Sequence, residues 1–209
     1  MLILVQARTS SKRFPRKILH EIQGKPLILH VIEKLKKSNF KNEIVVSTSI
    51  KKSDNELVAL LKKNEIKFYR GNLKNVAERL LKTALKQKKN YFVRVSGDSP
   101  VIDTNILDRM IRIHNRKSYK NYDIITNVFP KTFPKGMSFE IIKTKIIINN
   151  LKFMSDSDKE HVTQYFYNNS SLFRIKNLFN FNEKKYKVDL TVDKKIDLKK
   201  IEVYLKKNV

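Results

Sequence analysis

Leu2-Ile-Leu-Val5 runs directly into Gln6-Ala-Arg-Thr-Ser-Ser-Lys-Arg-Phe-Pro-Arg-Lys17, and this junction decides the fold. Four aliphatic residues in a row are typical of a short buried strand. The stretch that follows carries five cations, several hydroxyls and backbone N–H groups, which is the chemistry needed to hold a polyphosphate. It contains no glycine, so it is neither a Walker loop nor a dinucleotide-binding fingerprint. Composition also leaves open a solvated basic loop.

Beyond this junction, strand and helix patterns alternate over the first two thirds of the chain. We expect strands over 2–5, 43–48, 66–69 and 91–95, and helices over 26–37, 54–64, 76–88 and from 103 or 104 to 117. Ser53 is the expected cap of the second helix. This order predicts an α/β fold: a mostly parallel twisted sheet with helices on both faces, in a Rossmann-like three-layer arrangement. Ligands of such sheets bind at the loops beyond the carboxyl ends of the strands.

The pattern loosens after residue 122. We expect strands over 122–127, 137–142, 173–178 and 186–190, helices over about 144–153 and 159–168 and from about 196, and a proline-bounded loop over 129–136. No repeat and no flexible linker separates these elements from the first part of the chain. We therefore expect a single domain over 1–209, with a less regular segment at about 129–180.

The composition fits a folded protein with a large excess of positive charge. The 209 residues include 45 Lys and Arg against 20 Asp and Glu, which gives a formal net charge of +25, and 41% are hydrophobic. Such a charge favours nucleic-acid binding. However, Lys outnumbers Arg 35 to 10 and is spread over nearly every predicted helix, a distribution that the codon bias of an AT-rich genome also produces. We therefore expect no nucleic-acid partner.

Several classes of site are excluded because the chain has no cysteine. Disulfides, thiolate metal sites and cysteine nucleophiles are all ruled out, and the composition fits a reducing compartment. A secretory signal needs about 7–15 apolar residues in a run and a membrane span about 20, and the sequence offers neither. We expect a cytoplasmic protein without a membrane partner.

Two acids follow later strands and can return to the same sheet edge as the basic loop. Asp98 lies in Ser96-Gly-Asp-Ser-Pro100, and Asp193 ends Leu190-Thr-Val-Asp193. Mg²⁺ usually takes one or two protein carboxylates together with phosphate oxygens and water, so this pair can hold it. An ordinary turn at Asp98 and a helix N-cap at Asp193 are the alternatives. Asp156-Ser-Asp158 has the Asp-x-Asp spelling of many glycosyltransferases, but it precedes a predicted helix, where a cap or turn is expected.

A series of motifs, in order along nearly the whole chain, carries a family resemblance. They are Gln6-Ala-Arg8, Ser11, Arg13, Pro15-x-Lys17, Gly24-Lys-Pro26, Arg70-Gly71, Arg94-Val-Ser-Gly-Asp-Ser-Pro-Val-Ile-Asp103, Glu160-His-Val-Thr163 and Leu190-Thr-Val-Asp193. In this combination the sequence resembles the spore coat polysaccharide biosynthesis protein F group. That group is similar to the acylneuraminate and 3-deoxy-manno-octulosonate cytidylyltransferases.

The resemblance implies a Mg²⁺-dependent nucleotidyltransferase that couples CTP to a sugar acid or related acceptor and releases pyrophosphate, for surface-polysaccharide synthesis. Catalysis would fall to Arg13, Lys17 and Asp98, and the metal to Asp98 and Asp193. The implied nucleotide-binding residues are Gln6, Ala7, Arg8, Ser10, Ser11, Arg13, Lys17, Ser47, Arg70 and Gly97. Glu140 and His161 are the implied acceptor-side residues. A homodimer with contacts in the segment 129–180 is also implied.

Three positions depart from the family pattern. Ser10 and Arg16 stand where the first loop usually has glycines, so an altered loop geometry is expected. Ser138 replaces the acid of the usual Gly-Leu-Asp-Val-Glu motif, which leaves the identity of the acceptor open. A nucleotide-sugar-dependent glycosyltransferase and a basic nucleic-acid-binding module are the alternative functions, and an inactive relative is a further one.

Overall fold

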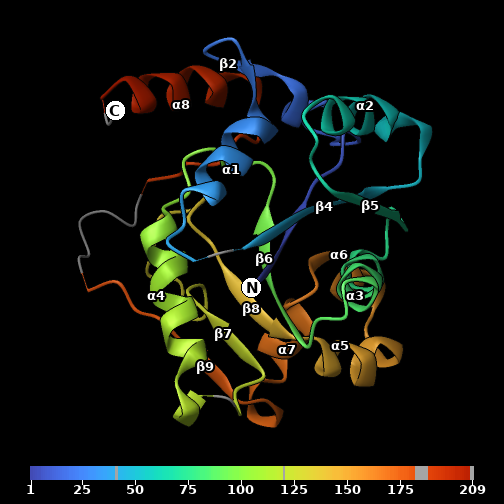
Figure 1. Ribbon diagram of the computed structural model, residues 1–209, viewed down its shortest axis with the longest axis vertical. Helices are drawn as coiled ribbons and strands as arrows, with labels where there is room; N and C mark the ends of the chain where they lie inside the picture. The colour runs from blue at the N-terminus through green and yellow to red at the C-terminus, as the bar shows by residue number, and fades with distance from the viewer. Residues whose placement is uncertain (41, 120, 182–187, 208–209) are drawn as a thin grey trace.

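The computed structural model describes residues 1–40, 42–119, 121–181 and 188–207. In this part of the chain seven strands form one sheet in the order β5-β4-β1-β6-β8-β7-β9, and β2 and β3 form a separate ribbon (Figure 1). The strands are β1 Leu2–Gln6, β2 Glu21–Ile22, β3 Lys25–Pro26, β4 Glu43–Ser49, β5 Phe68–Gly71, β6 Tyr91–Ser96, β7 Ile124–Thr126, β8 Glu140–Lys143 and β9 Ile175–Asn177. Because β1 pairs in parallel with both β4 and β6, the loops after these three strands meet at one edge.

One strand of the sheet is reversed. β8 runs antiparallel to both β6 and β7, whereas β7 and β9 are parallel to each other. The sheet is therefore mostly parallel, and the predicted fold class is confirmed. The reversal pairs Glu140, the first residue of β8, with Arg94 of β6.

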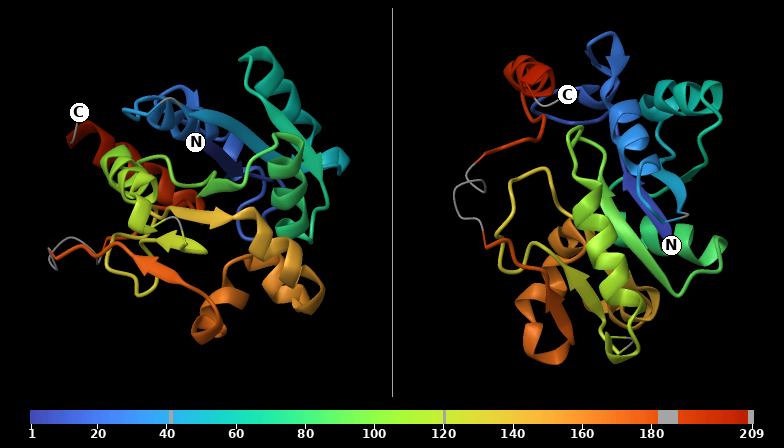
Figure 2. Two further views of the ribbon diagram at one scale, coloured as in Figure 1. Left: turned by 60° about the horizontal axis from the view of Figure 1, so that its bottom comes forward. Right: turned by 60° about the vertical axis from the view of Figure 1, so that its left-hand side comes forward.

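The side chains of β1 alternate between two hydrophobic cores. Ile3 and Val5 belong to one core, and Leu2 and Leu4 to the other, and all four are 0% exposed. A strand that is apolar at every position is covered on both faces. The helices are α1 Leu27–Lys36, α2 Asn55–Lys63, α3 Val76–Lys86, α4 Thr104–Asn115, α5 Thr144–Asn150, α6 Asp156–His161, α7 Gln164–Asn168 and α8 Lys195–Lys207. The first core takes side chains from α1, α2, α4 and α8, and the second from α3, α5 and α7, so helices flank the sheet on both sides (Figure 2).

Two helices differ from their predictions. Ser53 does not cap α2; it lies in a 3-10 turn over Lys52–Asp54, and the Asp54 side chain turns instead toward the first loop and the end of β4. The helix expected over 159–168 is divided into α6 and α7 at Val162, whose φ is +62°. Positive φ is strained for a β-branched residue, so a valine is not expected to end a helix in this way. The sequence pattern therefore did not predict the break.

The C-terminal part of the chain passes back toward the central strands. The strand expected over 186–190 falls partly outside the described residues, and within them Asp189 forms only an isolated bridge with Lys135. α8 begins at Lys195, one residue before the expected start, and α4 begins after Asp103, whose side chain accepts from Asn105 N. None of the helices described here is long and apolar enough to cross a membrane.

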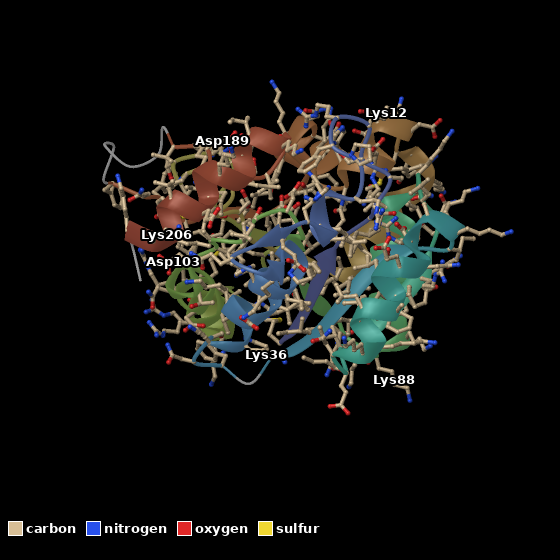
Figure 3. The ribbon with its side chains drawn as sticks, turned by 90° about the horizontal axis from the view of Figure 1, so that it is seen from above. Lys12, Lys36, Lys88, Asp103, Asp189 and Lys206 are labelled. Atoms are coloured by element: carbon tan, nitrogen blue, oxygen red, sulfur yellow. The ribbon has the colours of Figure 1, made fainter. Side chains whose placement is uncertain are left out.

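The lysines are distributed around the molecule. Figure 3 looks onto the top of Figure 1, and the labelled Lys12, Lys36, Lys88 and Lys206 lie well apart in it. A surface of this kind supports the interpretation of the charge as solvated lysines on many faces.

Candidate active site

The loops after β1, β4 and β6 are joined at their bases by backbone hydrogen bonds. Gly97 N donates to Gln6 O over 2.9 Å, and Ala7 N donates to Ser47 O over 3.2 Å. A Cβ atom on Gly97 would lie 3.0 Å from both Ala7 Cβ and Gln6 O, which is tighter than an ordinary contact. A side chain at position 97 would therefore force one of the two strand ends to shift. The structure brings these four predicted residues together, chiefly through their backbones.

A buried carboxylate anchors the first loop. Asp54 is 0% exposed, and its Oδ1 accepts from Thr9 N over 2.7 Å while its Oδ2 accepts from Ser49 N over 3.0 Å. Further hydrogen bonds come from the hydroxyls of Thr9, Thr48 and Ser49. Burial raises the pKa of Asp54, but these hydrogen bonds outweigh it, so the net pKa lies below the ordinary 3.8. Asp54 therefore stays ionised and fixes the loop to the end of β4.

The loop closes without the glycines that the family pattern predicts. Arg16 has φ +59°, in the left-handed region, and its N donates to Thr9 O over 2.7 Å. The Arg16 guanidinium forms an ion pair with Glu56 of α2. Ser11 Oγ lies 3.5 Å from Phe14 N, while Ser10 Oγ is buried without a hydrogen-bond partner in the described part of the chain.

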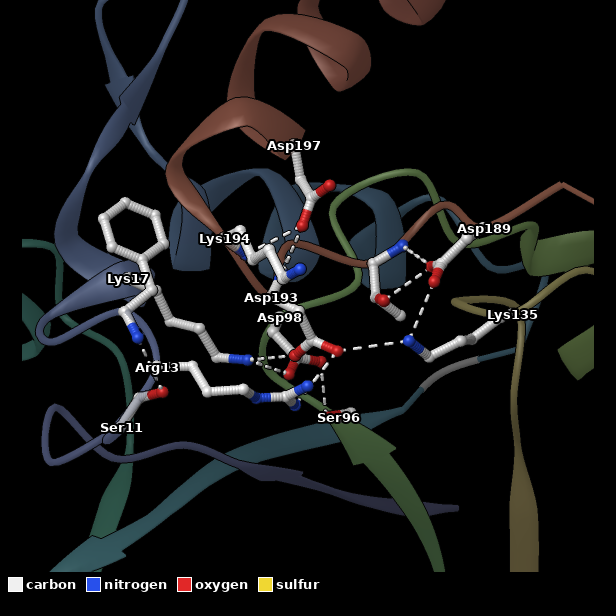
Figure 4. A network of polar contacts seen from close by, with 12 residues as sticks. Ser11, Arg13, Lys17, Ser96, Asp98, Lys135, Asp189, Asp193, Lys194 and Asp197 are labelled. Carbon is white, nitrogen blue, oxygen red and sulfur yellow. Dashed lines mark hydrogen bonds and ion pairs between the residues drawn. The ribbon is translucent and has the colours of Figure 1, made fainter.

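Lys17 lies between two acids that come from distant parts of the chain. Its Nζ is 2.5 Å from Asp98 Oδ2 and 3.1 Å from Asp193 Oδ1 (Figure 4). The three side chains are only 12%, 20% and 19% exposed, respectively. Ser96 Oγ donates to the other oxygen of Asp98 over 2.6 Å and so helps to orient it. Three of the predicted site residues therefore form one cluster at the ends of β1 and β6.

Asp193 reaches this cluster because the chain before α8 returns to β6. Val192 N donates to Asp98 O over 3.0 Å. Asp197 Oδ2 accepts from Asp193 N and Lys194 N, so Asp197 takes the capping role at the start of α8. The alternative that Asp193 caps this helix is therefore wrong. Its carboxylate instead faces Lys17 and, at 3.1 Å, Nη2 of Arg13, a further predicted site residue.

Lys135 is a member of the cluster that the sequence analysis missed. Its Nζ lies 2.8 Å from Asp189 Oδ2 and 3.1 Å from Asp193 Oδ2. Partial burial lowers the pKa of Lys135, but the bonds to both aspartates raise it above its ordinary value. Burial alone would raise the pKa values of both aspartates. Hydrogen bonds from Lys135 and Thr191 outweigh it at Asp189 and bring the pKa of Asp189 to about 2. At Asp193, hydrogen bonds from Lys17 and Lys135 lower the pKa below its ordinary value.

A sequence signal for Lys135 does exist in the glycine that follows it. Gly136 has φ +97°, and a Cβ there would lie 2.8 Å from the backbone of Leu190. Only glycine fits such a turn against a neighbouring backbone. The Lys135-Gly136 pair therefore marks the place where the turn before β8 touches the segment that carries Asp193.

The donor set of the cluster fits a divalent cation bound together with a polyphosphate. Asp98 and Asp193 present carboxylate oxygens to a common point, now marked by the Lys17 ammonium, and hard oxygen donors are the ligands that Mg²⁺ prefers. The described residues contain no group of three or more Asp, Glu, His or Cys side chains able to hold a metal by themselves. Phosphate oxygens and water would complete the coordination. Lys17, Arg13 and Lys135 supply the positive charge that an anionic ligand needs.

Comparison with known proteins identifies the kind of protein that carries this cluster. Residues 2–209 match the family model described as cytidylyltransferase. The chain belongs to the cytidylyltransferase family. The spore coat polysaccharide biosynthesis protein SpsF of Bacillus subtilis is 29% identical to it over 216 residues, which cover 99% of this chain and 87% of that protein.

Solved structures agree with this assignment. A cytidylyltransferase from Leptospira borgpetersenii superposes with a TM-score of 0.87 and 27% identity, covering 99% of this chain and 94% of that one. The structure of CMP:2-keto-3-deoxy-manno-octonic acid synthetase complexed with CTP gives a TM-score of 0.74 at 16% identity, with coverage of 100% and 99%. The expected family and the nucleotidyltransferase-like α/β fold are both confirmed.

Two further predicted residues of this cytidylyltransferase lie on the β4–β5 side of the strand ends. Arg70 Nε donates to Ser49 O over 2.9 Å and its Nη2 to Lys51 O over 3.0 Å, which ties β5 to the turn after β4. Ser47 is 0% exposed, and its Oγ lies 3.3 Å from Thr83 Oγ1 of α3. Arg70 stays partly exposed, whereas the Ser47 hydroxyl faces the interior.

Arg79 lies on the same side of the cytidylyltransferase, and the sequence analysis missed it too. It belongs to the first turns of α3, is 1% exposed, and donates from Nη1 to Asn72 O over 2.6 Å. Its Nε and Nη2 are buried and have no hydrogen-bond partner among the described residues. The same helix carries two exposed lysines, Lys82 and Lys86, and its sequence pattern does not distinguish Arg79 from such surface cations.

Glu140, expected on the acceptor side, lies within a buried network. It is 4% exposed; its Oε2 accepts from Arg94 Nη1 and its Oε1 from Tyr167 OH, each over 2.6 Å. Arg94 Nε also donates to Gln6 Oε1 over 3.1 Å. Burial and the charge of Glu140 raise the pKa of Tyr167 well above its ordinary range. Glu140 therefore holds Arg94, and Arg94 in turn binds the side chain of Gln6.

His161, the other acceptor-side candidate, is exposed at the end of α6. Its neighbour Glu160 pairs with Arg8, with Oε1 2.6 Å from Arg8 Nη2, and this contact holds α6 against the first loop. The strained turn at Val162 follows, with Thr163 N donating to His161 O over 2.8 Å. His161 is therefore exposed next to the residue that binds Arg8 of the first loop, whereas Glu140 is buried.

Proposed function

We propose that this chain is a Mg²⁺-dependent enzyme that transfers the cytidylyl group of CTP to a hydroxyl of a sugar acid or a related anionic acceptor. The observation that carries the proposal is the contact of Lys17 with both Asp98 and Asp193 at the ends of β1 and β6. Membership of the cytidylyltransferase family supports the reaction class, and the solved CTP complex of a similarly folded synthetase supports the nucleotide. Similarity to SpsF supports a role in surface-polysaccharide synthesis.

The chemistry requires positioning and charge neutralisation more than a covalent nucleophile. An acceptor oxygen forms a bond to the α-phosphorus while the bond from that phosphorus to the bridging oxygen of the β-phosphate breaks, pyrophosphate leaves, and the hydroxyl proton passes to water. In this proposal Lys17 and Arg13 would neutralise the phosphate oxygens, and Asp98 and Asp193 would hold the metal. Bound Mg²⁺ would supply further charge neutralisation and align the triphosphate. Lys135 at the rim of the cluster suits an acceptor carboxylate.

A pyrophosphate-release assay tests this proposal. The full chain is incubated with Mg²⁺, CTP and a panel of sugar acids, and release that depends on both CTP and an acceptor is expected. Asp98→Asn should reduce this release by orders of magnitude, whereas Asp156→Asn, at a fully exposed acid outside the cluster, should leave it unchanged. Release of nucleoside diphosphate from a nucleotide sugar without pyrophosphate would instead support the glycosyltransferase alternative. Tight binding of DNA or RNA at physiological salt as the sole activity would support the nucleic-acid alternative.

We also propose that the chain forms one domain and a homodimer. The seven-stranded sheet draws strands from residues 2 to 177, which supports one folding unit. In the less regular segment, Ile148, Phe153 and Leu172 are 50%, 62% and 72% exposed, and apolar surface of this kind suits a subunit contact. Sedimentation at micromolar concentration tests the dimer, and Leu172→Glu should shift a dimer to monomer.

A further inference from the structure

Arg79 combines full burial with unused hydrogen-bonding capacity. Arg79 is 1% exposed, and no ion pair with a carboxylate is found for its guanidinium among the described residues. Nη1 donates to Asn72 O and Leu73 O, but Nε and Nη2 are both unpartnered. Most buried polar groups in proteins have partners, and a buried cation without them is costly. Two adjacent donors left open in this way indicate a ligand.

The two open nitrogens lie on one edge of the guanidinium. Nε–H and the nearer N–H of Nη2 point in the same direction and form a fork that matches two neighbouring acceptor atoms. Burial and the nearby Arg8 lower the pKa of Arg79 to about 10, while Asp54 raises it, so the group remains protonated and donor-only at neutral pH. The fork therefore selects a ligand edge with two adjacent acceptors and rejects one that presents a donor.

The position of Arg79 matches the nucleoside end of a bound nucleotide. The Arg79 Cγ is the atom that a Cβ on Gly71 would meet, at 2.9 Å, so the side chain lies against the end of β5. The proposed metal site is at the ends of β1 and β6, and the sheet order is β5-β4-β1-β6. With strands about 4.8 Å apart, β5 and β6 are separated by about 14 Å. A nucleotide with its triphosphate at Lys17 and Asp98 would bring its base to Arg79 by extending across the ends of β1 and β4 toward β5.

We propose, building on the proposed function, that Arg79 selects cytosine by donating from Nε and Nη2 to the O2 and N3 acceptors of the base. Uracil has the same O2 but carries a hydrogen on N3, so it would face the fork with a donor and leave one buried N–H unpaired. A site built to hydrogen-bond one group discriminates strongly against an analogue that lacks it. Entry of the base requires a shift of the turn over residues 71–73, whose carbonyls hold the other edge of Arg79.

Calorimetric titration of the full chain, with Mg²⁺ present, tests the proposal. The variants are Arg79→Lys and Arg79→Gln, and the control is Lys82→Met on the exposed face of the same helix. The ligands are CTP, UTP, 3-deazacytidine triphosphate, in which C–H replaces N3, and pyrophosphate. We expect the wild type and Lys82→Met to prefer CTP over UTP and over the deaza analogue by roughly tenfold to hundredfold. In both Arg79 variants the affinity for CTP should fall to within about threefold of the affinity for UTP, and the affinity for pyrophosphate should stay unchanged.

Each of the other outcomes overturns the proposal. Retained CTP preference in both folded Arg79 variants shows that another group selects the base. Equal weakening of CTP, UTP and pyrophosphate shows that Arg79 binds phosphate or supports the fold. If neither variant folds, the wild type still decides, because equal affinity for CTP and the deaza analogue contradicts a contact with N3. Absence of nucleotide binding in the wild type defeats the proposed function itself, whereas the first two outcomes leave it standing.

Discussion

The ammonium of Lys17 lies 2.5 Å from a carboxylate oxygen of Asp98, although 81 positions separate the two residues. This contact joins the loop after β1 to the turn after β6, and Asp193 adds the segment before α8. Polar groups from three distant parts of the chain are thereby concentrated at one sheet edge. Such convergence at the carboxyl ends of adjacent parallel strands is where α/β proteins bind their ligands.

Replacing Lys17 tests the role of the central cation. Lys17→Met should lower kcat/KM with CTP by about 100-fold or more, because a preorganised charge at the phosphate oxygens is lost. Lys36→Met, at an exposed position of α1, is the matched control and should keep wild-type turnover. Steady-state pyrophosphate release measures both. Wild-type kinetics in Lys17→Met would show that its charge is not used in the reaction.

Neutralising either acid of the pair tests the metal assignment. Asp98→Asn and Asp193→Asn should each weaken the Mg²⁺ dependence of CTP binding and reduce turnover by orders of magnitude, since a carboxylate ligand is removed. Circular dichroism should stay native, because both acids are partly exposed at the edge of the sheet. A Mg²⁺ titration of CTP affinity measures the effect. If the Mg²⁺ concentration at the midpoint of the titration is unaltered in both variants, these acids do not bind the metal.

Asp54 should control acid stability. Its pKa is depressed in the folded chain, so the unfolded state binds more protons, and the stability that Asp54 contributes is present above about pH 4 and is lost as the pH falls further. Asp54→Asn should cost about 2–3 kcal/mol at pH 7 and make the unfolding free energy less dependent on pH below 4. Urea unfolding at several pH values measures this. If the unfolding free energy of the variant depends on pH below 4 as steeply as that of the wild type, Asp54 does not have the anchoring role.

Glu140 should behave as a structural residue. Glu140→Gln leaves the Arg94 guanidinium without its buried counter-charge, and we expect a loss of about 3 kcal/mol of folding free energy. Thermal unfolding provides the measurement. If Glu140→Gln keeps the wild-type melting temperature but raises the KM for the acceptor, Glu140 binds the acceptor instead.

Much of the fold follows from local pattern. The alternation of strands such as 2–5 and 91–95 with amphipathic helices predicts the parallel half of the sheet, and the structure confirms it. The meeting of Lys17 and Asp98 also follows, because loops after neighbouring parallel strands share an edge. Asp193 joins them through the irregular segment before α8, where Val192 N donates to Asp98 O. Motif resemblance identified the family that the comparisons confirm.

The missed features depend on contacts between distant residues. Periodicity assigned the acid after Ser53 to a helix start, whereas the Asp54 side chain binds Thr9, 45 positions away. Ser and Arg replaced expected glycines, yet Arg16 adopts the left-handed conformation because Thr9 and Glu56 hold it. Burial of Arg79 depends on the turn after β5 closing over it. None of these relations leaves a regular spacing in the sequence.

Titration of the wild-type chain with CTP, with and without Mg²⁺, is the most direct test of a nucleotide site at Lys17, Asp98 and Asp193. We predict Mg²⁺-enhanced binding that is selective for CTP over UTP, ATP and GTP, and a higher melting temperature. A ligand at 100 times its dissociation constant adds about 2.7 kcal/mol of stability. Millimolar CTP that produces neither heat of binding nor a shift in melting temperature, with or without Mg²⁺, would contradict a nucleotide site at Lys17, Asp98 and Asp193.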